Sequence, residues 1–364
     1  MQSFSKPLRA LFLGMALVSV MLACVSYLLL TEIRRPAGDS NELVVFVVEP
    51  GESTNAIATK LADEKLIRFP LLFSNLVRSQ ELDGSLKAGT YNLTRDMTMS
   101  QIISALQVSP SFAEVSLTII EGMRREQIAA LVDNAGFASI DAESFLAATA
   151  DGATFKERHF LLNTLPDGAS LEGYLFPDTY RFREGATTDE VINAMLDNFD
   201  GKYATFETTI QVTQNVHEIV TMASIVQREA TRTAEMPQIA AVFWNRLKPE
   251  FAGETGNGKL QSDPSLQYVL GTPANWWPNV NTLTLDEING NTDPYNTRVQ
   301  PGLPPGPISA PGLAALEAAA KPDQAATYLY FVASCTDPGA HNFATSFAEF
   351  QALEQEYLAC APAS

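Results

Sequence analysis

The hydrophobic positions of the chain begin with an unbroken run. Residues 10–30, 21 in all, carry no charged side chain and lie between Arg9 and Glu32. At a rise of 1.5 Å per residue, a helix of this length matches a hydrocarbon core of about 30 Å. The run is longer than a signal-peptide core, and no convincing small-residue cleavage site follows it. We therefore expect residues 1–33 to form a cytoplasmic tail and a single transmembrane anchor.

Cys24 offers an alternative kind of anchor, because Met21-Leu-Ala-Cys24 has the form of a lipoprotein cleavage site. The apolar run continues beyond this cysteine, which a lipid-anchored end would not need, so we favour the spanning helix. Two basic residues flank the run on each side. Glu32 and the free amino terminus therefore decide the orientation, and they place the rest of the chain outside the inner or cytoplasmic membrane.

The next pattern predicts a small β-α-α-β module at residues 42–110, after a polar linker at residues 34–41. Expected elements are a strand at 43–48, a helix with Ile57, Leu61 and Leu66 on its apolar face, a helix at 69–78, a strand at 89–93 and a short helix at 98–106. The strand, the Pro-Gly-Glu-Ser turn and the Ile-Ala-x-x-Leu helix resemble a LysM module, which binds N-acetylated glycan chains. A spacer domain without a ligand is the alternative.

Residues 111–364 are predicted to form a larger mixed α+β domain. A strand at 115–120 and helices at 124–135 and 141–148 open it. Proline and glycine cluster in later loops that are too apolar or too specific for ordinary linkers, at 171–178, 270–278 and 301–312. The expected fold class is thus α+β, with an N-terminal transmembrane helix, a LysM-like module and a larger domain.

Composition narrows the range of ligands. The 46% hydrophobic content is ample for a packed core, and the formal charge of −18 would repel nucleic acid and anionic headgroups. A neutral or bulky polymeric substrate is easier to reconcile with this charge. His159, His217 and His341 lack the short spacings of zinc sites, so we expect no metal. Cys335 and Cys360 could pair in an oxidising compartment or remain free thiols.

Residues 216–230 carry the residue best suited to chemistry. Helical periodicity places one carboxylate, Glu229, on an apolar face with Ile219, Met222, Ile225 and Val226. Burial raises the pKa of a carboxyl group toward neutrality, which a general acid needs in order to hold its proton near pH 7. A structural alternative is an ion pair with Arg246, and Glu218 near the start of the helix is the rival acid.

Polar residues in other segments suit the amides and hydroxyls of an aminosugar polymer. A serine, an aspartate and a proline after Gln261 predict a helix start, so Gln261 and Asp263 would lie at a helix mouth. The stiff proline-rich run at 302–308 suits a groove wall. The candidates for substrate binding are Glu172, Gln261, Asp263, Tyr295 and Asn296.

These segments, in this order, resemble the YceG-like endolytic murein transglycosylases (MltG), and the resemblance covers nearly the whole chain. It rests on Leu171-Glu-Gly-Tyr-Leu-Phe-Pro-Asp-Thr-Tyr180, Ala223-Ser-Ile-Val-Gln-Arg-Glu229, Val242-Phe-Trp-Asn-Arg-Leu247, Leu260-Gln-Ser-Asp-Pro264, Tyr295-Asn-Thr297, Gly302-Leu-Pro-Pro-Gly-Pro-Ile308, Pro311-Gly312, Tyr328-Leu-Tyr-Phe-Val332 and His341-x-Phe343. Gln227 stands where relatives often have an acidic residue, and Arg298 stands where they tend to have a tyrosine.

The resemblance implies that residues 111–364 are a catalytic domain that cleaves the β-1,4 bond between N-acetylmuramic acid and N-acetylglucosamine within nascent glycan strands. Glu229 would act first as acid and then as base, so that the muramic C6 hydroxyl closes a 1,6-anhydro ring without cofactor or metal. Asn296 and Gln261 would hold the N-acetyl groups, with Tyr295, Asp263 and Glu172 supporting the cleft. Peptidoglycan synthases are the implied protein partners.

Two alternatives to this enzyme are open. A non-catalytic, membrane-anchored peptidoglycan-binding scaffold would use the LysM-like module, with Glu229 as a structural residue. A hydrolase would cut the same bond with water and form no anhydro ring.

Overall fold

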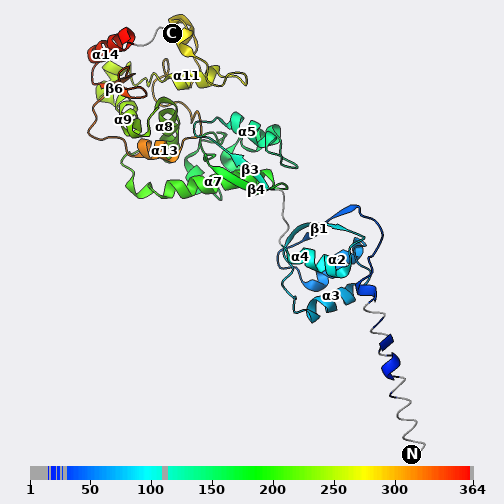
Figure 1. Ribbon diagram of the computed structural model, residues 1–364. Helices are drawn as coiled ribbons and strands as arrows, with labels where there is room; N and C mark the ends of the chain where they lie inside the picture. The colour runs from blue at the N-terminus through cyan, green and yellow to red at the C-terminus, as the bar shows by residue number, and fades with distance from the viewer. Residues whose placement is uncertain are drawn as a thin grey trace, which may run out of the picture. The chain divides into compact units, whose positions relative to one another are not determined.

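The computed structural model describes residues 31–108 and 114–360, together with scattered positions between 15 and 27. The chain folds into two compact units, residues 1–112 and residues 113–364 (Figure 1). The predicted anchor at residues 10–30 lies largely outside the described residues. Within the part of the chain that is described, no helix is long and apolar enough to cross a membrane.

The small unit contains the predicted β-α-α-β arrangement followed by a further helix. Its two strands are antiparallel, with Val44 opposite Leu93. The elements are β1 (Leu43–Val48), α2 (Thr54–Asp63), α3 (Pro70–Ser79), β2 (Gly89–Thr94) and α4 (Met99–Gln107). Ser53 caps α2 by accepting the backbone N–H of Ala56. Ile57, Leu61 and Leu66 are all buried as predicted, although α2 ends before Leu66.

The large unit is mostly helical, with two short two-stranded sheets. Its longer helices and strands are β3 (Glu114–Thr118), α5 (Arg125–Asn134), α6 (Ala142–Ala148), β4 (Thr179–Arg183), α7 (Thr188–Ala204), α8 (Val216–Glu229), α9 (Met236–Arg246), α11 (Asp263–Leu270), α13 (Leu313–Ala320), β5 (Tyr330–Ala333), β6 (His341–Ala344) and α14 (Phe347–Cys360). Short helices α10 (Ala252–Thr255) and α12 (Leu285–Gly290) lie between them. The predicted α+β class is therefore observed in both units.

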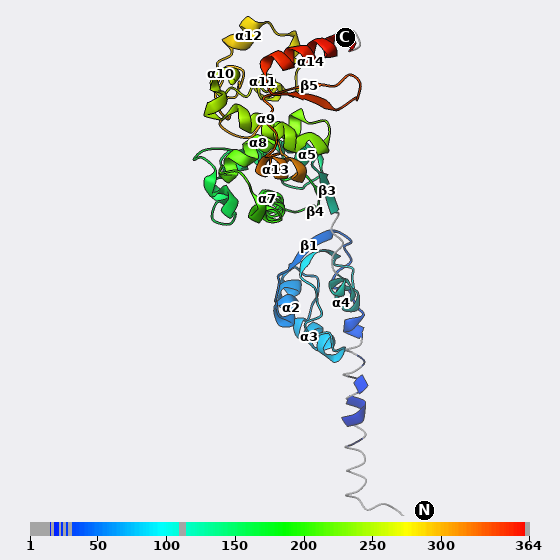
Figure 2. The same cartoon turned by 90° about the vertical axis from the view of Figure 1, so that its left-hand side faces the viewer.

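Helix α8 is the centre of the large unit, packed against α9, α11 and α13 (Figure 2). Asn215 starts it with a capping box, in which its side chain accepts the N–H of Glu218 and Glu218 accepts the N–H of Asn215. All residues from Ile219 to Val226 are buried, so the helix is enclosed on every side. The polar members of this stretch, Thr221 and Ser224, are satisfied inside the core, because their hydroxyls donate to the backbone oxygens of His217 and Thr221.

Helix α9 begins three residues before the predicted start at Ile239. Met236 and Pro237 form its first turn, where the missing N–H of proline would have no helical partner in any case. The predicted packed face is observed, with Ile239, Val242 and Phe243 buried.

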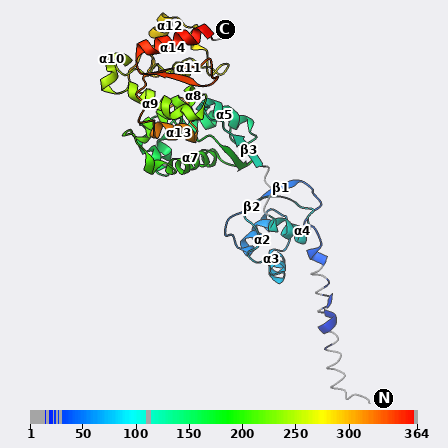
Figure 3. The same cartoon turned by 60° about the vertical axis from the view of Figure 1, so that its left-hand side comes forward.

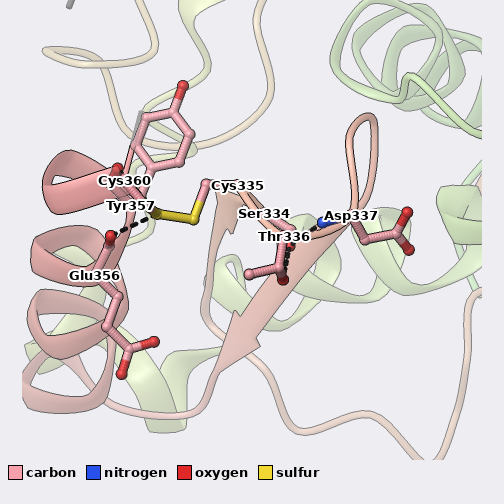
Figure 4. Close-up of a disulfide and its surroundings, with 7 residues drawn as sticks. All are labelled: Ser334, Cys335, Thr336, Asp337, Glu356, Tyr357 and Cys360. Carbon is pink, nitrogen blue, oxygen red and sulfur yellow. Dashed lines mark hydrogen bonds between the residues drawn. A yellow bond between two sulfur atoms is a disulfide. The ribbon is translucent and has the colours of Figure 1, made fainter. Parts of the chain in front are cut away.

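The C-terminal part of the large unit consists of the β5–β6 hairpin and helix α14, which packs against both strands (Figure 3). A disulfide joins Cys335, in the turn after β5, to Cys360, the last residue of α14 (Figure 4). The pairing left open by the sequence is thus present. No residue of α14 is fully buried, so this helix lies on the surface.

Candidate active site

Glu229 is the last residue of α8 and lines a cleft of about 410 Å³. Its side chain is half-buried, whereas Ile225 and Val226 in the preceding turn are completely buried. The predicted apolar face is therefore present, but Glu229 lies at its end rather than in its middle. Helix α8 therefore runs through the core and ends at the cleft, where its last residue places the carboxylate.

Ser262 holds the Glu229 carboxylate. Its Oγ donates a hydrogen bond of 2.8 Å to Oε1 of Glu229, and the serine is 1% exposed. Ser262 occupies the N-cap position of α11, as predicted, but its side chain makes no cap hydrogen bond. A serine hydroxyl at an N-cap usually accepts a backbone N–H of the first helical turn. Here the hydroxyl donates to the Glu229 carboxylate instead.

Burial raises the pKa of Glu229 from 4.5 to about 7. The Ser262 hydrogen bond opposes this rise, and so does the positive charge of Arg298, whereas the charge of Asp263 adds to it. The C-terminal end of a helix also carries partial negative charge, which disfavours an anion there. Glu229 can therefore hold a proton near neutral pH and release it at small cost.

Asp263 and Arg298 form an ion pair beside the acid. Arg298 donates from Nε to Oδ1 of Asp263 at 2.8 Å and also from Nη2, and both side chains are one third exposed. Both residues line the cleft with Glu229. Asp263 is thus at the predicted helix mouth, and Arg298 is its partner.

Gln261 also lines the cleft, and Arg246 fixes its side chain. Arg246 Nη2 donates to Oε1 of Gln261 at 2.6 Å, which leaves the amide NH₂ of Gln261 for other partners. Arg246 also donates to the backbone oxygens of Lys259 and Leu329. The alternative ion pair between Arg246 and Glu229 is not formed.

Part of the cleft wall is aromatic. It comes from β5, with Tyr330, Phe331 and Val332, and from α14, with Phe347, Phe350 and Glu354. Tyr330 and Phe331 lie in the motif already matched at 328–332, but no local signal connects the α14 residues to Glu229. They reach the cleft only because the fold brings α14 close to Glu229, which lies more than 100 residues earlier in the chain.

The two side chains before Glu229 point away from the cleft, as helical geometry predicts. Gln227 accepts the N–H of Gly312 at 2.9 Å and contacts Glu121. Arg228 stacks on Trp277, with its guanidinium 4.0 Å from the ring centroid. These contacts fix the last turn of α8 and so the direction of Glu229.

Glu172 lies elsewhere, at the N-terminus of α5. Its carboxylate is 4% exposed and accepts the backbone N–H of Arg125 through both oxygens, at 3.0 and 3.2 Å. Burial raises its pKa to about 7, against the effect of that backbone hydrogen bond. Glu172 does not line the Glu229 cleft, and its observed contacts are those of a helix cap.

Asn296 and Tyr295 are also outside the lining of this cleft. Asn296 is 0% exposed, and its Nδ2 donates to the backbone oxygens of Ile288 and Asn291 at 2.9 and 2.8 Å. It therefore has no surface to offer to an N-acetyl group, and it shapes the loop instead. Tyr295 packs against Tyr268, and burial raises its pKa to about 12.

The rival acid Glu218 lines a different cavity, of about 470 Å³, near the start of α8. Gly302, Leu303 and Pro304 line that cavity with it. The proline-rich run therefore forms a wall, as predicted, but not one of the Glu229 cleft. Ile308 anchors its end by donating its N–H to Ser224 in α8 at 3.0 Å.

The geometry brings together Glu229, Gln261 and Asp263, and it separates them from Glu172, Tyr295 and Asn296. A single carboxyl group with a pKa near neutrality, in a cleft with amide, charged and aromatic walls, can protonate a leaving oxygen and later accept a proton. A glycosidase pair would need a second carboxylate about 5 to 9.5 Å from the first, on the other side of the sugar. Two other carboxylates line the cleft: Asp263, which is paired with Arg298, and Glu354 on α14.

Comparisons with known proteins identify the family of the chain. The model of the YceG-like family matches residues 46–356, which include most of the small unit. The endolytic murein transglycosylase of Bacillus subtilis is 31% identical over 334 residues, covering 88% of this chain and 86% of that protein. The same-named protein of Streptococcus pneumoniae serotype 2 is 32% identical over 82% of this chain, which spans 56% of its length. A crystal structure of a yceG-like protein from Listeria monocytogenes superimposes with a TM-score of 0.53 and 31% identity, covering 86% of this chain and 100% of that one.

Proposed function

The chain belongs to the YceG-like family, and from this premise we propose that it is an endolytic peptidoglycan lytic transglycosylase with Glu229 as its catalytic residue. Its relatives in Bacillus subtilis and Streptococcus pneumoniae are named endolytic murein transglycosylases. The observation that carries the proposal is the position of Glu229. It is half-buried in a cleft, with a pKa near 7 and one hydrogen bond from Ser262.

In the first step, protonated Glu229 donates its proton to the oxygen between N-acetylmuramic acid and N-acetylglucosamine. The bond from that oxygen to C1 of the muramic sugar breaks, and an oxocarbenium-like centre develops at C1. The leaving strand departs with the proton, and Glu229 becomes a carboxylate. Ser262 then donates its hydrogen bond to a full negative charge, which strengthens that bond.

In the second step, the Glu229 carboxylate takes the proton of the muramic C6 hydroxyl. The C6 oxygen attacks C1 and closes a 1,6-anhydro ring, and Glu229 is again protonated for the next turnover. No water is consumed. Because the same carboxyl group must give and take a proton, a pKa close to the working pH serves both steps.

The walls of the cleft have separate parts in this proposal. Gln261 presents its amide NH₂ to a carbonyl oxygen of an N-acetyl group, because Arg246 occupies its own oxygen. The Asp263–Arg298 pair places a guanidinium beside the acid without leaving an unpaired charge. Glu172 and Asn296 stay outside the chemistry and stabilise the loops that support it.

The test is incubation of the purified protein with uncrosslinked glycan strands, followed by mass spectrometry of the ends. We expect 1,6-anhydro ends from the wild type and none from Glu229→Gln. Glu218→Gln is the matched control, since it changes a carboxylate of the same helix in a different cavity and should keep activity. Ends heavier by one water would identify a hydrolase, and strand binding without new ends would identify a scaffold.

The proposal extends to the N-terminal part of the chain. The uncharged run at residues 10–30 would anchor the protein in the cell membrane, with the catalytic unit on the outer side. The anchor would confine cleavage to nascent strands, close to the peptidoglycan synthases with which we expect it to associate. After cell fractionation, the full chain should stay with membranes through carbonate washing, and a chain lacking residues 1–33 should not. Release of the full chain by carbonate would contradict the anchor, and failure of a synthase to co-purify with it after crosslinking would contradict the association.

The small unit has the strand-turn-helix start that suggested a LysM-like module. We include glycan binding by residues 42–110 in the proposal. Binding of the isolated module to glycan strands, measured by co-sedimentation with insoluble peptidoglycan, is the test. If the folded module stays in the supernatant, it does not bind glycan and is a spacer.

A further inference from the structure

Three aromatic rings that line the cleft lie against one another. Tyr330 and Phe350 are stacked with centroids 5.3 Å apart, and Phe347 and Phe350 are stacked at 6.1 Å. Tyr330 is nearly buried, and its hydroxyl donates to the backbone oxygen of Glu254. The Arg246 guanidinium lies 5.2 Å from the centroid of the Tyr330 ring. Tyr330 is thus a fixed base on which the two phenylalanines of α14 pack.

Phe347 is the exposed member of this group. Half of its surface, 50%, is open to solvent although it lines the same cleft as Glu229. Phe347 differs from other exposed apolar side chains because it lines the cleft of the acid and stacks on a second aromatic ring of the same cleft, so the two offer a shared apolar surface there. Sugar rings present apolar C–H faces, and aromatic side chains provide a broad apolar surface for them.

We propose that Phe347, carried by α14, is a substrate-binding residue that packs against a sugar ring of the glycan strand, and that the Cys335–Cys360 disulfide keeps α14 in the position where it can do so. This inference rests on the proposed function, because it takes the strand to be the occupant of the Glu229 cleft. The aromatic side chains and the acid line the same cavity, so a strand seated at Glu229 would lie beside them.

The position of α14 depends on few contacts. None of its residues is fully buried, and its apolar packing consists of Phe347, Phe350 and Leu353 against a small cluster that contains Leu329 and Tyr330. A helix with so little buried surface is weakly held by packing alone. The disulfide adds a covalent tie at its far end, between Cys360 and the hairpin turn (Figure 4).

Hydrogen bonds also hold this hairpin turn against the segment that follows Glu229. Arg232, three residues after the acid, donates to both carboxylate oxygens of Asp337 and to the backbone oxygen of Pro338. Glu235 accepts from the backbone N–H and from Nδ1 of His341 at the start of β6. The disulfide therefore joins α14 to a turn whose place relative to Glu229 is already set.

The experiment compares strand binding and turnover in Phe347→Ala and in Leu358→Ala. Leu358 is a matched control, because it is 69% exposed on the same helix but does not line the cleft. Loss of a stacked aromatic contact should raise KM for glycan strands about tenfold in Phe347→Ala, with kcat little changed. Phe347→Trp should keep the KM of the wild type, as should Leu358→Ala. Equal KM values in the two alanine variants would overturn the proposal.

The disulfide is tested by Cys335→Ser together with Cys360→Ser, alone and combined with Phe347→Ala. If the disulfide positions Phe347, its loss should raise KM toward the Phe347→Ala value, and adding Phe347→Ala should then have little further effect. A disulfide-free protein with the KM of the wild type would overturn the positioning role. Thermal denaturation of each variant shows that the large unit remains folded.

Binding measurements in the Glu229→Gln background separate this inference from the proposed function. If the wild type forms no anhydro ends, the proposed function fails, and the affinity of the Glu229→Gln protein for strands still tests the aromatic surface. If ends do form and are lost with Glu229→Gln, but Phe347→Ala binds as tightly as Leu358→Ala, the function stands and this inference fails.

Discussion

Replacing Glu229 by glutamine should inactivate the protein and, at the same time, make its fold more stable at alkaline pH. The folded pKa of Glu229 is raised from 4.5 to about 7. A group with a raised folded pKa contributes its full stability below the unfolded value and loses it as pH rises through the folded value. The contribution of Glu229 to the free energy of unfolding of the wild type should therefore fall between pH 4.5 and pH 7 and stay constant at higher pH.

The expected difference in free energy of unfolding between the two proteins follows from the raised pKa of Glu229. A difference of about 2.5 pKa units, at about 1.36 kcal/mol per unit, corresponds to about 3 kcal/mol. The side chain is half-buried, and water screens part of this energy, so we expect a gain of about 1 to 3 kcal/mol. Glutamine has the same shape, has no charge to bury, and its Oε1 can still accept the Ser262 hydroxyl.

The assay is urea denaturation of the wild type and of Glu229→Gln at pH 4 and at pH 8, in parallel with the glycan assay. The two proteins should be nearly equal in free energy of unfolding at pH 4, and the variant should be the more stable at pH 8. Glu172 also has a pKa of about 7, but it is common to both proteins and cancels in the difference. An equal gap at both pH values, or a variant that is less stable at pH 8, would refute the reasoning.

Three further predictions concern the surroundings of the acid. Ser262→Ala removes the donor that favours charged Glu229, so the alkaline limb of the pH–rate profile should move up by about one to two pH units. Arg298→Gln should move that limb to higher pH, because the positive charge of Arg298 lowers the pKa of Glu229. Asp263→Asn should move it to lower pH, because the negative charge of Asp263 raises that pKa. Shifts of both variants in the same direction would contradict this electrostatic account. Asn296→Ala leaves two backbone carbonyls without a donor and should lower the free energy of unfolding by about 1 to 3 kcal/mol in urea denaturation, with strand affinity of the folded protein unchanged.

Local elements of this protein could be predicted because their signals are local. The strand at Leu43–Val48, the capped helix after Ser53 and the helix ending at Glu229 depend on residues within one or two turns of each other. Periodicity also directed Gln227 and Arg228 away from the acid. It could not show that α8 is enclosed on all sides, because Val220, Thr221, Ala223 and Ser224 are buried by other elements.

Substrate-binding residues could be predicted less well, because a polar side chain looks the same in sequence whether it faces a cleft or closes a loop. The amide of Asn296 suits an N-acetyl group, but the backbone oxygens of Ile288 and Asn291 accept its two N–H bonds. The charge of Glu172 suits a cleft, but α5 begins next to it, and the backbone N–H of Arg125 donates to both of its oxygens. In each case a backbone group from another segment decided the outcome.

Ser262 shows the reverse case, because its sequence context predicts a structural role, whereas its side chain contacts the proposed catalytic acid. Its position predicts a helix cap, yet its hydroxyl reaches Glu229, 33 residues earlier in the chain, and α11 begins without a side-chain cap. A lost cap costs about 1 kcal/mol. A hydroxyl donor limits how far burial and the helix end can raise the pKa of the acid, and without it Glu229 would keep its proton to a higher pH. The loss of a local interaction at α11 therefore keeps the pKa of Glu229 near 7, where one carboxyl group can both give and accept a proton.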